Sequence, residues 1–435
     1  MNPPLGVIGN FCALGAQYTV NAIAGAVPIV HSGAACCLRL YEGLSGANGC
    51  QGQSPMGGSA TPNDNIHRHS LVRGSEEDLG RLIEGTLRAV PAELYVVLTG
   101  CNVEVVGDDV ESVVRRFQAQ GVPIVAVSTP GFKGDVQAGH EWVVQSILRK
   151  FVRGPRSQEP RLLNLWGVVP YWDPFWSGNL ETLIALLEHL GFQVNRLFGF
   201  GSSVENWQRI PAAGLNLLVS PWSGLETMEL LRRRFGTPFL HCPVPPVGAR
   251  DTRLFLERIA PYAFLADKPL QTWIHNEESR CQYYLERVAH LFSHYDDSQP
   301  DGFCVVADAS KVLSLSRFLS GELGLTPGPQ FITAPIPERF QELWNQFAPT
   351  QARHPLTPIL LRTNFQLEQE LRSWGRRPFL LGNSEVRALA QQFCGAFLGV
   401  SAPLEDQLVM NHSYWGWNGG LRLAEDLYTT MMGGL

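Results

Sequence analysis

Short apolar runs alternate with helix-like patterns from one end of this sequence to the other. The runs are continuously apolar, which is typical of strands covered on both faces, as in parallel sheets. Repeated strand–helix–strand units therefore predict an α/β protein built from doubly wound, Rossmann-like domains. The strands are expected at residues 94–99, 122–129, 162–169, 215–220, 303–309, 358–364 and 379–383.

The segments between these runs carry signals for helix starts and stops. In 108–121, apolar residues fall on one stripe, Asp108 is the expected N-cap and Gly121 the expected stop. The segment 179–191 places its leucines on one face and ends at Gly191. Ser223 and Glu226 have the spacing of a capping box at the start of a further helix.

Two polar, proline-bearing seams divide the chain of 435 residues, at 153–163 and 293–303. They predict three α/β domains, which comprise residues 1–158, 159–298 and 299–435. The glycine-rich first 60 residues are expected to be irregular and to pack onto the first domain.

Composition and missing motifs exclude several classes of function. The net charge of −6 offers no basic surface for nucleic acid, and no uninterrupted apolar run is long enough to cross a membrane. The N-terminal residues lack the pattern of a secretory signal, so a cytoplasmic location is expected. The sequence contains no GxxxxGK[ST] motif, which indicates that this chain does not itself hydrolyse ATP. It also contains no GxSxG motif of a serine hydrolase.

The cysteines carry the strongest chemical signal. Of nine, four lie in the first 50 residues, namely Cys12, Cys36, Cys37 and Cys50, and no CxxC pair is present. Cys12, Cys36 and Cys101 each lie close to a glycine, and the last two follow strand-like runs. Ligands of open α/β sheets gather at the carboxyl ends of strands, and glycine lets backbone N–H groups approach bound thiolates. This pattern favours an iron–sulfur cluster, whose irons are ligated by cysteine thiolates.

A structural role is the alternative for each of these residues. A single buried cysteine is more often a small hydrophobic residue than a ligand. His31 fits a core histidine with satisfied polar atoms, and Asp108 and Asp109 fit helix capping better than a pair of catalytic carboxylates. His67 and His69 fit an exposed polar loop, and Cys242, beside His241, fits the core. Cys281, Cys304 and Cys394 have no ligand-like neighbours in the sequence.

Three segments together resemble the component 1 family of nitrogenases and nitrogenase-like reductases: "CALGAQ" from Cys12, "IVHSGAAC" ending at Cys36, and "TGCNVEVVGDDV" around Cys101. In that family the motifs C-x-x-G-A, V-H-G-x-x-G-C and T-C-x-x-E-x-I-G-D-D supply the thiolates of an iron–sulfur cluster. The resemblance therefore implies Cys12, Cys36 and Cys101 as cluster ligands. "TPGF" at 129–132 and "NHSYWGWNGGLRLAEDLY" at 411–428 extend it over nearly the whole chain. It implies three α/β domains, with the cluster site between domains at a subunit interface.

The closing segment "LEDQLVMNHSYWGWNGG" resembles that of the β-type subunit. Cys242 occupies a place like that of the α-type metallocluster cysteine, but His412 lies too close to the closing segment to be its histidine partner. A β-type subunit that relays electrons is therefore predicted, with no catalytic residue of its own. Gly131 stands where the molybdenum β subunit has a cluster-ligating serine, and the chain is short before Cys12. Both departures favour a nitrogenase-like enzyme such as methylthio-alkane reductase, which cleaves carbon–sulfur bonds. Cys37 is expected to be a buried neighbour rather than a ligand.

The resemblance also implies cofactors and partners. The cofactor is an interface iron–sulfur cluster, with an eight-iron P-type cluster preferred and a four-iron cluster as the alternative, while a second metallocluster lies in the partner subunit. The partners are an α-type component 1 subunit in an α2β2 heterotetramer and a transient, ATP-hydrolysing iron protein. Alternative functions are the β subunit of a dinitrogen-reducing nitrogenase, a subunit of a tetrapyrrole double-bond reductase, and a non-catalytic scaffold for metallocluster assembly.

Overall fold

The computed structural model describes residues 12–433 apart from 46–60, 155–156, 295–299, 335, 338–339, 348–357 and 362. Its strands form three separate parallel sheets, in agreement with the predicted α/β class. Cys50 lies outside the described residues. No helix in the described ranges has the length and apolar character needed to cross a membrane.

The first sheet has the order β1-β2-β3, with β1 at Ala26–His31, β2 at Leu94–Thr99 and β3 at Ile124–Ser128. One face packs against α4 (Glu76–Ala89) and α6 (Val110–Gln118) through a separate apolar cluster. The other face packs against α1 (Ala16–Asn21) and α7 (Val136–Lys150). Because both faces are covered, all six residues of β2 are buried, which explains its continuous apolar sequence.

The second sheet has the order β5-β4-β6-β7. Its strands are β4 (Glu159–Trp166), β5 (Gln193–Asn195), β6 (Ala213–Val219) and β7 (Phe239–Cys242). Its helices are α8 (Trp176–His189), α9 (Val204–Arg209), α10 (Leu225–Phe235) and α11 (Gly248–Ile259).

The third sheet has the order β10-β9-β8-β11-β12. Its strands are β8 (Gly302–Ala307), β9 (Gln330–Ile332), β10 (Pro358–Leu360), β11 (Pro378–Gly382) and β12 (Ala396–Gly399). Its helices are α13 (Ala309–Gly321), α14 (Phe340–Phe347), α15 (Asn364–Trp374) and α16 (Arg387–Gln392).

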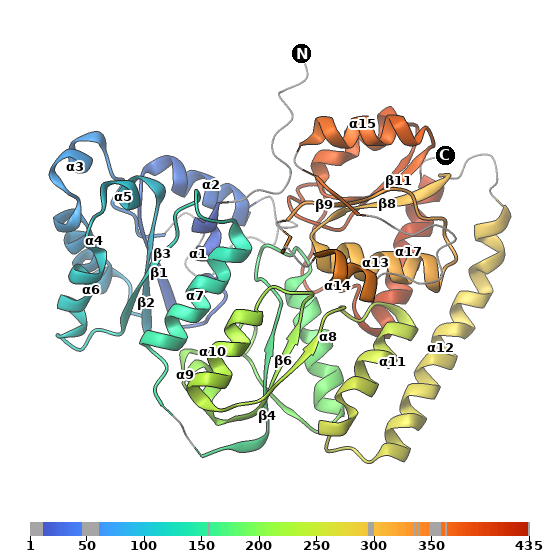
Figure 1. The fold of residues 1–435 in the computed structure, drawn as a ribbon, viewed down its shortest axis with the longest axis horizontal. Helices are drawn as coiled ribbons and strands as arrows, with labels where there is room; N and C mark the ends of the chain where they lie inside the picture. The colour runs from blue at the N-terminus through green and yellow to red at the C-terminus, as the bar shows by residue number, and fades with distance from the viewer. Residues whose placement is uncertain are drawn as a thin grey trace.

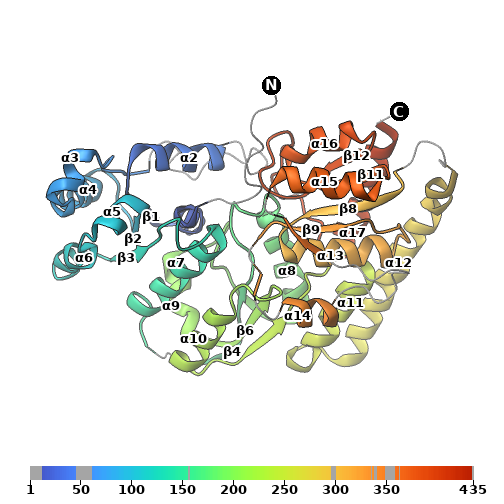
Figure 2. The same cartoon turned by 45° about the horizontal axis from the view of Figure 1, so that its top comes forward.

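Two long helices connect these units. The helix α12 (Asp267–His294) and the closing helix α17 (Gly416–Gly433) pack against each other and against α11, while α17 also contacts β12. The first sheet lies at one side of the molecule and α12 at the other (Figures 1 and 2). The closing segment, placed in the third domain from sequence, thus packs largely on helices that follow the second sheet. The domain boundaries themselves stay a prediction.

Three local predictions were wrong. The first 60 residues are not irregular where they are described, because they supply α1, α2 (Ala34–Ser45) and the strand β1 of the first sheet. The N-cap of α6 is Asp109, whose side chain accepts a hydrogen bond from the Ser112 N–H at 2.9 Å, and not Asp108. Asp108 instead accepts hydrogen bonds from Ser75.

The predicted capping box at the start of α10 is also absent. The N-cap there is Gly224, without a side-chain cap. The carboxylate of Glu141, on α7, accepts hydrogen bonds from the N–H groups of Gly224 at 3.4 Å and Thr227 at 3.1 Å. A distant carboxylate therefore takes the role that local spacing assigned to Ser223, because tertiary packing brings α7 against this helix start.

Candidate functional site

The carboxyl ends of the three strands of the first sheet hold two of the predicted site cysteines. After β1, Cys36 lies in the first turn of α2. After β2 and a single glycine, Cys101 is the first residue of the short helix α5 (Cys101–Val106). After β3, the loop that contains Gly131 follows at the same edge. Parallel strands carry their carboxyl ends to one edge, so these segments are neighbours.

Cys12 reaches this edge from a different direction. It precedes the 3₁₀ turn η1 (Ala13–Gly15) and forms an isolated antiparallel bridge with Asp135, at the start of α7. The Ala13 N–H donates to the Gly134 carbonyl at 3.2 Å. A side chain at Gly139, on α7, would overlap the carbonyl of Ala13, so this glycine allows η1 to pack directly on the helix.

The thiols of Cys12 and Cys101 converge on Gly131. The Gly131 N–H donates to Cys101 Sγ at 3.1 Å. A methyl group at position 131 would overlap Cys12 Sγ and would lie 3.6 Å from Cys101 Sγ. A glycine is therefore required for both sulfur atoms to lie at this point.

The electrostatics of Cys12 connect it with both other cysteines. Cys12 is exposed as a residue, but partial burial of its thiol is the main cause that raises the pKa of that thiol. The Leu14 N–H, which donates to Cys12 Sγ at 3.5 Å, opposes this effect. The thiols of Cys101 and Cys36 raise the pKa of Cys12 further, because adjacent negative charges are unfavourable. A bound cation would reverse this effect and favour the thiolates.

The donors at this edge are cysteine thiols with backbone N–H groups directed at two of their sulfur atoms. Among the residues described, no group of three or more His, Cys, Asp or Glu side chains is arranged to hold one metal ion. Iron–sulfur clusters are ligated by thiolates and stabilised by N–H donors to sulfur, and the Gly131 and Leu14 N–H groups already point at the sulfurs of Cys101 and Cys12. Cys12 is exposed, so the group would lie at the protein surface.

Cys37 does not share this setting. Burial is the main cause that raises the pKa of its thiol to about 12, and the charges of Cys36 and Asp64 add to the effect. The Cys37 thiol is therefore protonated at neutral pH, and its role as a neighbour rather than a ligand stays a prediction.

The remaining candidates occupy core or surface positions. Cys242, Cys281 and Cys304 are buried, and burial raises the pKa of Cys242 to about 12. The neighbouring His241 makes a hydrogen bond of 2.6 Å with the Ser220 carbonyl oxygen. Cys394 is exposed, as are His67 and His69, although His69 lies on the helix α3 (Arg68–Arg73) rather than in a loop.

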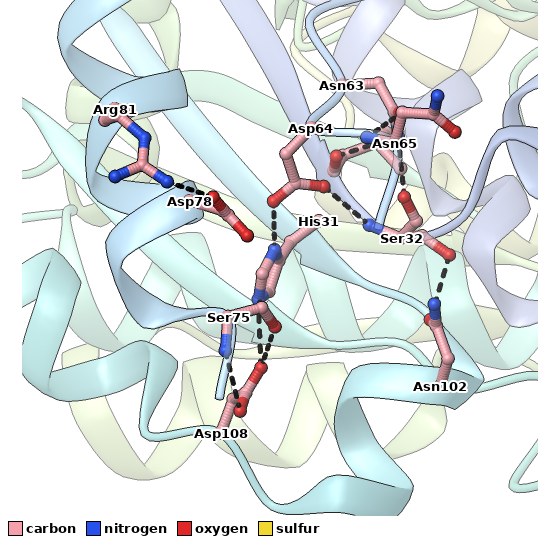
Figure 3. Close-up of polar contacts among 11 residues, drawn as sticks. His31, Ser32, Asn63, Asp64, Asn65, Ser75, Asp78, Arg81, Asn102 and Asp108 are labelled. Carbon is pink, nitrogen blue, oxygen red and sulfur yellow. Dashed lines mark hydrogen bonds and ion pairs between the residues drawn. The ribbon is translucent and has the colours of Figure 1, made fainter. Parts of the chain in front are cut away.

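His31 is a satisfied core histidine, but its partners were not predicted from the sequence. Its ring lies between the carboxylates of Asp64 and Asp108, next to the Ser75 hydroxyl (Figure 3). Asp64 falls in "NDN", which has the composition of an ordinary polar loop. The only hint in the sequence is that a buried histidine after a strand needs polar partners from elsewhere.

The comparisons with known proteins bear on this arrangement. The family model described as "Nitrogenase component 1 type Oxidoreductase" matches residues 12–432, nearly the whole chain. The chain belongs to the nitrogenase component 1 family.

Several individual members of the nitrogenase component 1 family are similar to this chain. The nitrogenase iron-iron protein beta chain of Rhodobacter capsulatus is 21% identical, over 96% of this chain and 91% of that protein. One of the subunits of the light-independent protochlorophyllide reductase of Angiopteris evecta is 25% identical, over 60% of this chain and 53% of that protein. The solved structure "Nitrogenase Cp1 at pH 6.5" superposes with a TM-score of 0.80 at 15% identity, over 100% of this chain and 94% of that one, which confirms the fold.

Proposed function

We propose that this chain is the β-type, electron-relaying subunit of a nitrogenase-like reductase, and that Cys12, Cys36 and Cys101 hold an iron–sulfur cluster at its interface with an α-type subunit. The observation that supports this most directly is the convergence of the Cys12 and Cys101 thiols on Gly131, with Cys36 as their electrostatic neighbour. The similarity to a nitrogenase beta chain over 96% of this chain supports the β-type assignment.

The cluster would supply storage and transfer of electrons, and the chain's own residues would hold it. An eight-iron P-type cluster is preferred, with a four-iron cluster as the alternative. The three thiolates would be ligands, and the Gly131 and Leu14 N–H groups would stabilise negative charge on Cys101 Sγ and Cys12 Sγ. The buried apolar strand β2 behind Cys101 would keep water away from this side of the site.

The proposed reaction is the reductive cleavage of carbon–sulfur bonds in small methylthio-alkanes, at a metallocluster in the α-type subunit. Gly131 stands where the molybdenum β subunit has a ligating serine, which supports a nitrogenase-like enzyme over a molybdenum nitrogenase and does not itself indicate the substrate. A side chain at that position would overlap Cys12 Sγ, so the site favours ligation by thiolates alone. A dinitrogen-reducing nitrogenase and an assembly scaffold remain alternative assignments.

A subunit of a protochlorophyllide-type reductase is the second candidate. The similarity to the Angiopteris evecta protein favours it, although that match covers 60% of this chain. This assignment would go with a four-iron cluster. The number of irons therefore distinguishes the two candidates.

The proposed electron donor is a separate, ATP-hydrolysing iron protein that docks transiently. This chain has no GxxxxGK[ST] motif to bind the phosphates of ATP itself. Electrons would pass from that protein to the cluster at the cysteines and then to the partner subunit.

Iron content tests the proposal. The chain is co-expressed with its α-type partner and purified without oxygen, as parent, Cys101→Ala and Cys394→Ser proteins. We expect Cys101→Ala to lose most of the bound iron and all turnover, because a thiolate ligand is gone. Cys394→Ser, which changes an exposed cysteine away from the site, should keep both. Full iron and activity in Cys101→Ala would contradict the proposal, and four rather than eight irons per interface would favour the second candidate.

A further inference from the structure

A buried ionic group lies behind the cysteine-bearing turns of the first sheet. The side chains of His31, Asp64 and Asp108 are 0%, 4% and 3% exposed. His31 Nδ1 contacts Asp64 Oδ2, and His31 Nε2 lies 3.5 Å from Asp108 Oδ2 and 3.5 Å from Ser75 Oγ (Figure 3). A carboxylate oxygen accepts hydrogen bonds and does not donate them, so the ring nitrogen Nδ1 is the donor in the contact with Asp64.

Burying charged side chains is costly, because the charges lose their hydration. Removing one partner of a buried ion pair leaves an uncompensated charge, whereas replacing the whole group by apolar residues is often neutral. A core of this size could therefore be stable without it. The hydrogen bonds from this group to neighbouring segments indicate which part of the structure it positions.

Asp64 connects the ionic group to the turn after β1. Its Oδ1 accepts the Ser32 N–H at 3.2 Å. The adjacent Asn63 donates its Nδ2 to the carbonyls of Val30 at 3.0 Å and Ser32 at 3.3 Å, and the Ile66 N–H donates to the Ser32 carbonyl at 3.0 Å. The segment around Asp64 thus fixes Ser32 from both its N–H and its C=O sides.

Ser32 in turn fixes the backbone on both cysteine-bearing segments. Its hydroxyl donates to Asn102 Oδ1 at 3.3 Å, and Asn102 directly follows Cys101. A side chain at Gly100 would overlap Ser32 Oγ, so the two turns are in direct contact. The Gly100 N–H donates to the His31 carbonyl at 3.0 Å, and the Cys36 N–H donates to the Gly33 carbonyl at 3.1 Å in the same turn.

We propose that Asp64, held by the buried His31 ring, is a positioning residue that fixes the turns of Cys36 and Cys101 relative to each other through Ser32. This inference rests on the proposed function, because it assigns the ionic group a role at that cluster site. His31, Asp64 and Ser32 are not proposed as ligands, and they act through the backbone of residues 32–36 and 100–102.

Two variants test this role. Asp64→Asn keeps the shape of the side chain and removes its charge, whereas Ser32→Ala removes only the hydroxyl contact to Asn102 and leaves the ionic group intact. Arg81→Ala is the matched control, since Arg81 is 67% exposed and, among the described residues, forms its ion pairs with Glu77 and Asp78 at the outer edge of the same region. Ser32→Thr, which retains a hydroxyl, tests rescue.

The first measurement does not depend on a bound cluster. Hydrogen exchange of the iron-free chain, in the assembly in which it is purified, should be about tenfold faster at residues 32–36 and 100–103 in Asp64→Asn, because a charge-assisted hydrogen bond is lost. Ser32→Ala should accelerate exchange at 100–103, with recovery in Ser32→Thr. The second and third sheets, and the Arg81→Ala protein, should match the parent.

The second measurement uses the loaded protein. Asp64→Asn and Ser32→Ala should retain less than about half of the parent's iron and should show an altered electron paramagnetic resonance spectrum, because the thiolates no longer share one geometry. Unchanged exchange together with unchanged iron and spectrum would overturn the inference. If Asp64→Asn accelerates exchange throughout the first sheet, the Ser32→Ala protein is the deciding variant. Unchanged exchange, iron content and spectrum in Ser32→Ala would then overturn the inference. Parent protein without iron would contradict the proposed function, and the exchange contrast would still test the positioning role.

Discussion

The missing side chain at position 131 decides how close the sulfur atoms of Cys12 and Cys101 can lie. The Gly131 backbone occupies the space next to both, and its N–H donates to Cys101 Sγ at 3.1 Å. The atom that an added methyl group would meet first is Cys12 Sγ, at the end of a side chain that can rotate. A substitution here would therefore move a thiol and leave the backbone in place.

Gly131→Ala should thus remove iron without unfolding the protein. The rotated Cys12 thiol would no longer face the site, so we expect at least a severalfold loss of bound iron. The melting temperature of the iron-free protein should change little, by an amount typical of a surface substitution. Gly85→Ala, on α4 with nothing within 4 Å of the added methyl group, is the control and should keep full iron. Iron binding by Gly131→Ala at the parent level would contradict this account of the site.

At the scale of elements, the helix α7 supports Cys12. Gly139 lets η1 pack on this helix, and the neighbouring His140 is buried beneath α1. Its Nδ1 shares a hydrogen bond of 2.8 Å with the Thr19 hydroxyl. Burial lowers the pKa of His140 to about 4, so the ring is neutral in the folded protein at neutral pH.

This burial predicts acid sensitivity in the first unit. The folded-state pKa of His140 is below its unfolded value of about 6.5, so the unfolded state binds the proton more readily. The contribution of neutral His140 to the free energy of unfolding is fully present above pH 6.5. It is lost as the pH falls towards 4, by up to about 3 kcal/mol. His140→Gln should flatten this part of the stability profile, measured by denaturant unfolding at several pH values. His69→Gln, at an exposed position on α3, should leave the profile unchanged, and an equal slope in His140→Gln and the parent would refute the assignment.

The comparison of sequence and structure is clearest at this scale. The strand β2 occupies residues 94–99 as predicted, because a strand buried on both faces leaves a continuous apolar run in the sequence. The short strands β5, β9 and β12 were not predicted, since three or four residues carry too little pattern. The caps at Asp109 and Gly224 were misplaced by local spacing, because Ser75 and Glu141 from other elements decide them.

The sequence predicted the kind of ligand at the candidate site but not the contacts that arrange the site. Cysteines beside glycines at strand ends indicate a cluster, and their placement at one edge follows from the parallel topology. The contact between Gly131 and two thiols and the role of Asp64 depend on how distant loops meet, and nothing in the local sequence around residue 64 encodes that. The ligand assignment itself stays a prediction.

For the molecule as a whole, a buried cluster of charges joins the second and third units. Lys311, on α13, lies 3.1 Å from Asp173, in the segment before α8, and 3.1 Å from Asp308. Burial alone would lower the pKa of Lys311, but the two carboxylates outweigh it and hold the pKa above its usual value. The Lys311 ammonium group of the third unit therefore pairs with Asp173 of the second unit and links the two.

Lys311→Met should destabilise this junction strongly. Removal of the cation leaves two carboxylates buried side by side, which typically costs about 3–5 kcal/mol. Denaturant unfolding followed by tryptophan fluorescence measures the loss, and Asp173→Asn in the same chain should recover part of it. Arg81→Gln, which breaks an exposed ion pair, should cost less than about 1 kcal/mol. A Lys311→Met protein as stable as its parent would show that the cluster does not hold the units together.

The assembly follows from the number of ligands that this chain offers. A four-iron cluster takes four protein ligands and a fused eight-iron cluster about six, whereas three thiols are proposed here. Cys12 is exposed, and Leu38, Val105 and Phe132, on or beside the cysteine-bearing segments, are 59%, 74% and 58% exposed. Exposed apolar side chains around an incomplete ligand set favour an obligate partner, here a homologous α-type subunit with its own thiols, across an interface of more than about 2,000 Å².

Two such pairs would form the α2β2 heterotetramer. Size-exclusion chromatography and native mass measurement of the co-expressed chains should give this mass, with iron present only in the complex. A monomer or homodimer that holds the complete cluster without a second kind of chain would contradict the assignment.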